Sequence, residues 1–364
     1  MKIVIISRGE IFASPTVLNY IQAFLSLGYN VVCICSSCRN NIKEDRVSIY
    51  QTGEPIVKNL ISKIFNFWRF RKRTLKVIKE NNLKSNAIFW VARIDTAIAF
   101  GEYFKNEKSV LSLHELHDQF LFWKYITQKV IRYYDQIVFN EYNRANIAKV
   151  WYKLLDTPNI IPNKPMYHSR ERNAIITNLE IQNIIYSIKS FGKKIIIYQG
   201  SLLSDRNLDP LVKATYLLRD RFQLILMGKD IEKRVPSFMK INPNLIHIPW
   251  VAPPDHLNVT SHCHIGVAFY DYDSLNSIYC APNKIWEYSG FSIPILAQNI
   301  PGLYTTIGIS NAGVCVDLNN QESIVDAIME LDNNYHSYSV NSRDFYDSVD
   351  FKESVRKVLY KVTK

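Results

Sequence analysis

The chain has 364 residues and a formal charge of +11, with 47% hydrophobic and 21% charged residues. At ~150 residues per domain two domains are expected, and the apolar content excludes a largely disordered chain. Only 12 residues are glycine, well below the usual ~7%, which argues against a protein built around several glycine-rich phosphate loops. The excess of positive charge predicts an anionic partner.

In the first half of the chain, short apolar segments alternate with amphipathic ones. The predicted strands are 2–6, 30–35, 87–92, 110–113 and 136–140. A helix is expected from Pro15 to Leu27, after an N-capping Ser14 and before Gly28. Strand–helix alternation of this kind predicts a parallel, doubly wound sheet.

A polar stretch over 164–192 precedes a second alternating series. Its predicted strands are 194–200, 223–227, 245–248, 265–269, 294–297 and 313–316, and its predicted helices are 208–219, 283–290 and 322–331. An amphipathic helix is expected over 351–362. The predicted domains are 1–165, with a C-terminal helix at about 348–364 packing back on it, and 190–345. Two Rossmann-like halves are expected to bind ligand between them, at the carboxyl ends of the strands.

Several motifs are absent from the sequence. No apolar run approaches the ~18 residues of a membrane span, and Met1–Arg8 reads as a first strand and a cytoplasmic start rather than a signal peptide. Cys33 and Cys35 lie in an apolar predicted strand, which favours reduced core thiols over a zinc site. Neither a dinucleotide-binding glycine motif nor a P-loop occurs, which argues against a dehydrogenase and a P-loop nucleotidase.

The segment 281–297 is the most informative. Pro282 and Asn283 are expected to start a short helix, with Glu287 one turn inside it. A helix N-terminus presents unpaired N–H groups that suit a diphosphate, and a nearby carboxylate can accept two hydrogen bonds from a ribose diol. The alternative is an ordinary helix–strand unit with a solvated glutamate.

This segment, PNKIWEYSGFSIP, resembles one in the GT-B glycosyltransferases, specifically the large retaining family that builds bacterial polysaccharides and glycolipids; the family's glycine before the last proline is replaced, at Ser292-Ile293. The resemblance implies an α/β, GT-B fold of two Rossmann-like domains whose parallel sheets face each other across a cleft. It implies that Glu287 binds the nucleotide ribose, and that Pro282, Asn283 and Lys284 lie near the donor diphosphate.

A second segment, 198–208, resembles the family's strand, glycine loop and basic residue. The resemblance implies that Gly200 starts the loop and that Arg206 pairs with the donor phosphates, a role that suits guanidinium geometry. Ser201 stands where the family often has a second basic residue. A surface arginine in a turn is the alternative for Arg206.

Further donor contacts are implied by the resemblance. Gly228 matches a strand-end glycine under the nucleotide, and Val251 lies where backbone groups pair with the base. His114 follows the strand 110–113 and matches a histidine near the donor sugar, with His117 or a structural histidine as alternatives. From the edge-of-sheet rule, the candidate acceptor contacts are Arg93, Asp95, Glu115, Asn140, Glu141 and Arg144.

One departure from the family leaves the stereochemistry open between retaining and inverting. Tyr279 stands where many members have a first glutamate, eight residues before the ribose-binding one. An inverting enzyme needs a base, for which Glu115 or Asp95 is the first candidate. Asp271-Tyr272-Asp273 is interpreted as a loop facing the cleft, so no obligatory metal and no cofactor are expected.

Most of the net charge is concentrated between 57 and 84, where nine basic residues face the single acidic Glu80. Apolar residues recur there at helical spacing, which predicts a basic amphipathic helix on an anionic membrane surface. A core helix with a solvated face is the alternative, and nucleic acid is not expected as a partner because no recognition motif accompanies the charge.

These observations predict a glycosyltransferase that transfers a sugar from a nucleotide sugar to a lipid-linked or growing glycan acceptor. Retention is the expected outcome, and capsule, exopolysaccharide or O-antigen synthesis the expected role. The expected location is cytoplasmic, peripheral on the inner face of the cell membrane. The alternatives are a nucleotide-sugar epimerase of the same fold and a non-catalytic GT-B partner subunit.

Overall fold

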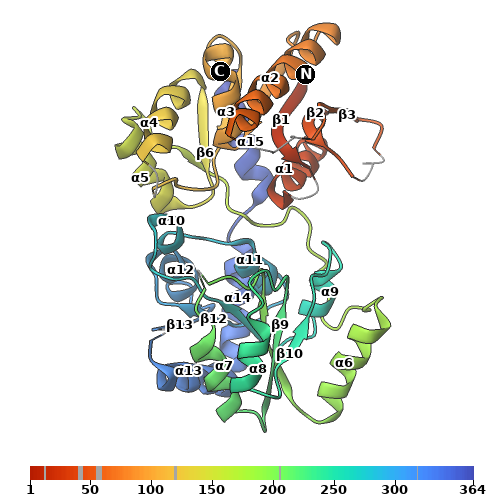
Figure 1. The fold of residues 1–364 in the computed structure, drawn as a ribbon, viewed down its shortest axis with the longest axis vertical. Helices are drawn as coiled ribbons and strands as arrows, with labels where there is room; N and C mark the ends of the chain where they lie inside the picture. The colour runs from red at the N-terminus through yellow and green to blue at the C-terminus, as the bar shows by residue number, and fades with distance from the viewer. Residues whose placement is uncertain (12–13, 40–43, 55–59, 119–120, 205, 318) are drawn as a thin grey trace. The chain divides into compact units, whose positions relative to one another are not determined.

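The computed structural model describes residues 1–11, 14–39, 44–54, 60–118, 121–204, 206–317 and 319–364 (Figure 1). They form two compact units. The first consists of Met1–Tyr167 together with Asp350–Lys364, and the second of His168–Val349. Each unit is an α/β layer structure built on one parallel sheet.

The first unit contains a seven-stranded sheet of order β3-β2-β1-β4-β5-β6-β7. Its strands are β1 (Lys2–Glu10), β2 (Asn30–Ser37), β3 (Val47–Gln51), β4 (Ala87–Ala92), β5 (Ser109–Ser112), β6 (Gln136–Phe139) and β7 (Asn159–Ile160). Its helices are α1 (Pro15–Ser26), α2 (Leu60–Glu80), α3 (Ile94–Phe100), α4 (Leu121–Val130), α5 (Tyr142–Tyr152) and α15 (Phe351–Thr363), with short 3-10 turns at Gly101–Phe104 and Ile131–Tyr133. The predicted strands and the helices at 15–27 and 351–362 are confirmed, whereas β3 and β7 were not predicted.

Aromatic packing joins the last helix to the first. Tyr20 of α1 lies 4.8 Å from Trp90 of β4 and 5.9 Å from Phe351 of α15, measured between ring centroids. Figure 1 accordingly shows the blue α15 among the elements of the first unit. Because the first residues of α15 are buried in this core, the chain end is part of the first unit.

The second unit contains a six-stranded sheet of order β10-β9-β8-β11-β12-β13. Its strands are β8 (Lys194–Gln199), β9 (Phe222–Met227), β10 (Ile246–Ile248), β11 (Ile265–Ala268), β12 (Ile295–Gln298) and β13 (Gly313–Val316). Its helices are α6 (Leu179–Ser190), α7 (Asp209–Leu217), α8 (Val235–Ile241), α9 (His256–Thr260), α10 (Leu275–Ile278), α11 (Asn283–Gly290), α12 (Pro301–Leu303), α13 (Gln321–Asn333) and α14 (Tyr335–Asp347), with a π-helical turn at Tyr304–Gly308.

Of the helices described in this unit, sequence reasoning predicted only α7, α11 and α13, and the two longest that it missed are α6 and α14. Helix α6 lies inside the polar stretch 164–192, yet Asn178 caps it by accepting from the Ile181 N–H at 3.0 Å. Ile181, Ile185 and Ile188 then bury one stripe at helical spacing. Helix α14 packs on α11 through the stacked rings of Trp286 and Phe345, at 4.4 Å.

A buried carboxylate ties α13 to the amino-terminal edge of the second sheet. The Asp332 side chain is 2% exposed and pairs with Lys194, with Arg221 Nη2 at 2.7 Å and with His264 Nε2 at 2.7 Å. Burial alone would raise the pKa of Asp332, but hydrogen bonds from Lys194 and His264 lower it below its usual value. One side chain thus holds residues next to three strands.

We expect Asp332→Ala to lower the free energy of unfolding by about 2–3 kcal/mol, because three donors lose their buried acceptor. Urea titration measures the change. The matched control is Asp347→Ala, which removes an exposed carboxylate paired with Arg170 and is expected to cost less than about 1 kcal/mol. Equal costs for the two variants would contradict the structural role of Asp332.

Stability is also expected to fall in acid. Burial lowers the pKa of His114, His168 and His264 to about 4, whereas an unfolded histidine titrates near ~6.5. The unfolded chain therefore binds more protons between these values, so stability is full above pH ~6.5 and declines as the pH falls towards ~4. Urea titrations through this window are expected to show a slope of up to about 1.4 kcal/mol per pH unit for each histidine.

Replacing one of these histidines isolates its share of the pH dependence. His264→Asn is expected to reduce the pH slope of stability by up to about 1.4 kcal/mol per pH unit, the contribution of one proton. His336→Asn, at an exposed position, is expected to leave the slope unchanged. A His264 variant that kept the full slope would show that its ring is protonated in the folded protein.

Candidate functional site

The carboxylate of Glu287 lies in a hydrogen-bonded network at the carboxyl edge of the second sheet. Its side chain is 13% exposed. Gln199, the last residue of β8, donates its amide N–H to Glu287 Oε2 and accepts from Thr260 Oγ1 at 2.7 Å. His256 Nε2 lies 3.5 Å from Glu287 Oε1. Residues from β8, α9 and α11 therefore fix the direction of one carboxylate.

Sequence reasoning identified Glu287 but missed Gln199, His256 and Thr260. Gln199 was read only as the end of a strand, and no motif connects α9 to the glutamate. Their polar side chains at a strand end and on a short helix gave no specific signal, because the three residues are far apart in the chain and meet only through the fold.

His168 contacts the C-terminal half of α11 and the residue that follows it. Its ring lies 4.2 Å from the Phe291 ring, and Nε2 lies 3.0 Å from the Glu287 carbonyl oxygen. Nδ1 accepts from the Arg170 N–H at 3.0 Å, so Nε2 carries the proton and donates it to the carbonyl. Burial lowers the pKa of this ring to about 4, which keeps it neutral. Gly290 is required because a Cβ there would lie 2.6 Å from the ring.

Two glycines bring neighbouring strand ends into backbone contact. Gly200 follows β8 with φ of 139°, and Gly228 follows β9 with φ of 154°. A Cβ on Gly228 would lie 1.9 Å from the Gly200 carbonyl oxygen, so no other residue fits there. The positive φ values and the close backbone contact explain why glycine stands at both positions of this sheet edge.

Two cationic side chains flank this glycine loop. Lys284 Nζ lies 4.1 Å from the Tyr198 ring centroid and 3.4 Å from where a Cβ on Gly200 would be. The Arg206 guanidinium lies 5.0 Å over the Tyr270 ring, and its Nη1 donates to the Ser201 carbonyl at 3.5 Å. Lys284 also lies 5.3 Å over Tyr270. The fold therefore brings both expected phosphate contacts to the same loop, as a diphosphate would require.

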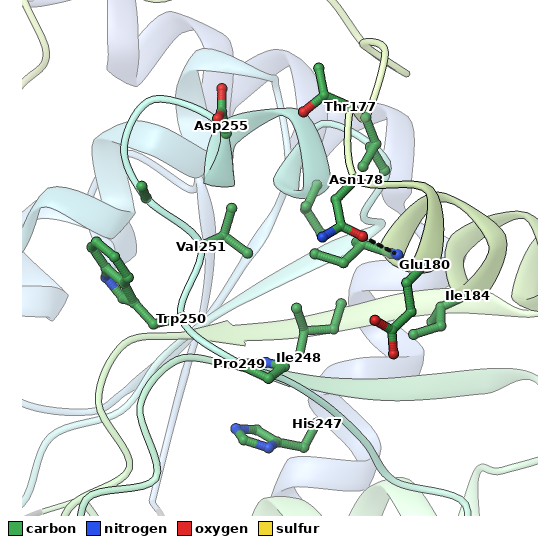
Figure 2. Close-up of a pocket in the computed structure, with 14 residues that line it drawn as sticks. Thr177, Asn178, Glu180, Ile184, His247, Ile248, Pro249, Trp250, Val251 and Asp255 are labelled. Carbon is green, nitrogen blue, oxygen red and sulfur yellow. Dashed lines mark hydrogen bonds between the residues drawn. The ribbon is translucent and has the colours of Figure 1, made fainter.

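A cavity of about 490 Å³ lies beside this edge, between α6 and the segment that joins β10 to α9. Figure 2 shows Val251 and Ile248 on one wall, with Asn178 and Glu180 of the α6 N-terminus on the other. Val251, expected at the base, lines this cavity. Pro282 is the N-cap residue of α11, directly before Asn283.

Both aspartates of the acidic loop expected to face the cleft accept hydrogen bonds from residues of the second unit. Asp271 Oδ1 accepts from the Asn207 N–H at 3.3 Å, and Asp273 accepts from Ser274 Oγ at 3.1 Å. Within the described ranges, no group of three or more His, Cys, Asp or Glu side chains could hold a metal ion. Tyr279 lies directly after α10.

In the first unit, several candidate residues follow β5 and β6. The His114 ring Nε2 lies 3.4 Å from Ser112 Oγ, and burial, together with the charges of Arg144 and Arg93, lowers its pKa to about 4. Arg144 donates to the His114 carbonyl oxygen and, at 3.4 Å, to Asn140 Oδ1. Glu141 caps α5 by accepting from the Arg144 N–H, while Glu115 is exposed.

The remaining acceptor candidates form a second group after β4. Arg93 Nε lies 3.4 Å from Asp95 Oδ1. His117, the rival histidine, lies 5.4 Å from the Trp123 ring. The fold therefore divides the expected acceptor residues between a β4 group and a β5–β6 group.

The basic helix is tied to its neighbours by arginines. Arg69 and Arg73 donate to the carbonyls of Glu54 and Thr52, and Arg71 donates to those of Ala99 and Phe100. The predicted surface also included 57–59, which lie outside the described residues. Phe65 and Trp68 are 54% and 55% exposed, and Lys72 lies over the Trp68 ring at 5.0 Å. No helix within the described ranges has the length and apolarity to cross a membrane.

Comparisons with known proteins agree with this architecture. Residues 193–334 match the family model described as "Glycosyl transferases group 1". No curated protein sequence matches the chain.

Similar solved structures span nearly the whole chain. A sucrose-phosphate synthase from Thermosynechococcus elongatus is 13% identical, with a TM-score of 0.72, over 99% of this chain and 98% of that one. WaaG, a glycosyltransferase involved in lipopolysaccharide biosynthesis, is 11% identical, with a TM-score of 0.67, over 98% of each chain. Anabaena HepE in complex with UDP is 9% identical, with a TM-score of 0.69, over 100% of each.

These likenesses establish the fold of both units, and the family match covers most of the second unit, including Gly200, Arg206 and Glu287. Residues 193–334 of the second unit therefore resemble a group 1 glycosyltransferase domain, and the two units have the GT-B fold.

Proposed function

We propose that this glycosyltransferase transfers a sugar from a nucleoside-diphosphate sugar to a hydroxyl of a lipid-linked or growing glycan. The network that holds Glu287 next to the cationic loop of Arg206 and Lys284 carries this proposal. The complex of the similarly folded HepE with UDP supports a uridine nucleotide as the first donor to test.

The donor is bound in three parts. The oriented carboxylate of Glu287 accepts hydrogen bonds from the ribose diol, and Arg206 and Lys284 pair with the diphosphate oxygens. The base enters the cavity beside Val251. Because both cations lie at the glycine loop, they stabilise the negative charge that develops on the leaving diphosphate.

The transfer step forms one bond and breaks one. The acceptor hydroxyl oxygen bonds to the anomeric carbon while the bond from that carbon to the diphosphate oxygen breaks, and the bonding electron pair leaves with the nucleoside diphosphate. In the retaining route proposed here, the hydroxyl proton passes to the leaving phosphate oxygen, so no protein base is needed. In an inverting route, Asp95 or Glu115 takes that proton.

His114 is proposed to position the donor sugar rather than to act as an acid. Burial keeps its pKa at about 4, so the ring is neutral near pH 7 and can donate or accept one hydrogen bond to a sugar hydroxyl. No obligatory metal is proposed, because Arg206 and Lys284 supply the charge that a metal would bring to the diphosphate.

The proposed acceptor is made on a membrane, which gives the remaining basic side chains a role. The exposed Lys72, Lys76 and Lys79 of α2, with Phe65 and Trp68, form a basic and aromatic surface suited to anionic lipid. The proposed location is therefore cytoplasmic, peripheral on the inner membrane face, and the proposed role is capsule, exopolysaccharide or O-antigen synthesis.

The ribose role of Glu287 is tested by nucleotide-induced thermal stabilisation with UDP, GDP, TDP and CMP. Binding to the native state raises the melting temperature. We expect at least one nucleotide to raise it in the wild type and Glu287→Gln to abolish the rise. Gln199→Ala is expected to weaken binding about tenfold, because the carboxylate loses its orienting donor, equivalent to about 1.4 kcal/mol.

Glu322→Gln, at an exposed position of α13, serves as the matched control and is expected to retain the full response. A Glu287→Gln variant that responds like this control would remove the ribose role. Product analysis with the responding donor, with and without a glycan acceptor, separates transfer from epimerisation.

The membrane surface is tested by flotation with vesicles of phosphatidylcholine, with and without phosphatidylglycerol. Joint replacement of Lys72, Lys76 and Lys79 by Gln is expected to weaken binding on the order of 100-fold, at about 1 kcal/mol per lysine. The arginines of α2 are left intact because they hold backbone carbonyls. The control replaces Lys352, Lys357 and Lys361 of α15, and equal losses in both triple variants would exclude α2 as the docking surface.

A further inference from the structure

Two arginines meet at the carboxyl edge of the first sheet. Strands β1 and β4 pair in parallel with Ser7 opposite Ala92, so Arg8 and Arg93 follow at the same level on adjacent strands. The Nη1 atom of Arg93 lies 3.7 Å from the position of a Cβ on Gly9. The guanidinium of Arg93 therefore lies against the backbone directly after Arg8.

The Arg8 guanidinium lies over an aromatic ring and has one buried nitrogen without a hydrogen-bond partner among the described residues. Its central carbon lies 3.7 Å from the centroid of the Phe67 ring, which covers one face. Nη1 is buried and has no hydrogen-bond partner among the described residues. Burial lowers the pKa of Arg8, Asp95 raises it and Arg93 lowers it, which identifies these two residues as its charged neighbours. A buried donor without an acceptor costs free energy unless a ligand supplies one.

Arg93 is held in an unfavourable backbone conformation. Its φ is 74°, in a region that residues with a Cβ seldom adopt. Its N–H donates to the Ser112 carbonyl at 2.9 Å, and its own carbonyl accepts from the Ala97 N–H at 3.2 Å. Strain of this kind persists where the surrounding structure enforces it and is concentrated at functional sites. The side chain that it presents is 54% exposed.

The charge at this edge favours an anion. Asp95 lies 3.4 Å from Arg93 Nε and also accepts from the Thr96 N–H at 2.9 Å. Asp95 is the carboxylate that acts on Arg8, whereas Glu115 and Asp118 act with Arg93 and Asp95 on the neighbouring His117. Around Arg8 itself, two guanidinium groups therefore face one carboxylate. Planar guanidinium forks bind phosphate and carboxylate oxygens through paired hydrogen bonds.

We propose that Arg8 and Arg93 bind an oxyanion, a phosphate or a carboxylate, carried by the acceptor, so that this enzyme glycosylates acidic acceptors. The assignment of the anion to the acceptor rests on the proposed function. The oxyanion site itself rests on the first unit alone, whereas the proposed contacts to the donor's ribose, diphosphate and base lie in the second. A phosphorylated lipid carrier and an acidic sugar such as a uronate both supply the required group.

The site is tested on the full chain with saturating UDP present, so that donor phosphate contacts are already occupied. Inorganic phosphate, glucuronate and the neutral control glucose are titrated calorimetrically at constant ionic strength. We expect phosphate or glucuronate to bind, and glucose not to bind. Arg8→Gln and Arg93→Gln are each expected to raise the dissociation constant at least tenfold, while Arg132→Gln, at an exposed position, leaves it unchanged.

A further variant separates binding from folding. Arg93→Gly accommodates the positive φ without strain, so it is expected to fold at least as well as the wild type and yet to lose the anion. UDP affinity is expected to stay the same in every variant, and a wild type that binds phosphate but no nucleotide would refute the proposed function while leaving the oxyanion site standing.

The two anion probes identify the source of the group. Binding of phosphate alone indicates a phosphorylated acceptor, and binding of glucuronate alone an acidic sugar. Unchanged anion affinity in the Arg8 and Arg93 variants, binding of glucose as tight as that of the bound anion, or no anion binding by the wild type would each overturn the proposal.

Discussion

The backbone contact between Gly200 and Gly228 is the constraint on which the proposed donor site depends. The ends of β8 and β9 approach until a single Cβ on Gly228 would overlap the Gly200 carbonyl oxygen. This contact fixes the loop that carries Ser201 and Arg206, and it leaves room for Lys284 to approach Gly200 from α11. A chain with few glycines thus has two of them at this sheet edge, where the positive φ of Gly200 and the close contact at Gly228 disfavour any other residue.

Glu287 is held in place through the same strand end. Its side chain is held by Gln199, which is the residue directly before Gly200, and its carbonyl oxygen is held by His168. The carboxylate proposed to bind ribose and the loop proposed to bind phosphate are consequently connected through one strand end. Because Gln199 is uncharged and donates to the Glu287 carboxylate, its replacement tests the orientation of that carboxylate and leaves the charge of the site unchanged.

The sequence was sufficient to predict the alternating elements, the second parallel sheet and the helix that carries Glu287, because hydrophobic periodicity and local motifs encode them. It failed at α6, where polar residues flank a stripe of three isoleucines, and at Gln199, His256 and Thr260, whose meeting requires the fold. It also missed Arg8. A lone arginine after a strand has no distinguishing pattern until its neighbours, Phe67 and Arg93, are known.

The positive charge of the chain is divided among different tasks. The sequence gives α2 most of the excess charge, yet Arg69, Arg71 and Arg73 of that helix donate to backbone carbonyls and so serve the fold. Lysines on the same helix remain exposed to solvent. At the sheet edge, Arg8 keeps a buried donor without an acceptor among the described residues. A count of basic residues cannot separate structural from ligand-binding cations. The two differ in whether protein oxygens already accept from their N–H donors. Charge that is fully satisfied internally stabilises structure, whereas a cation that keeps further donors can also select an anionic partner.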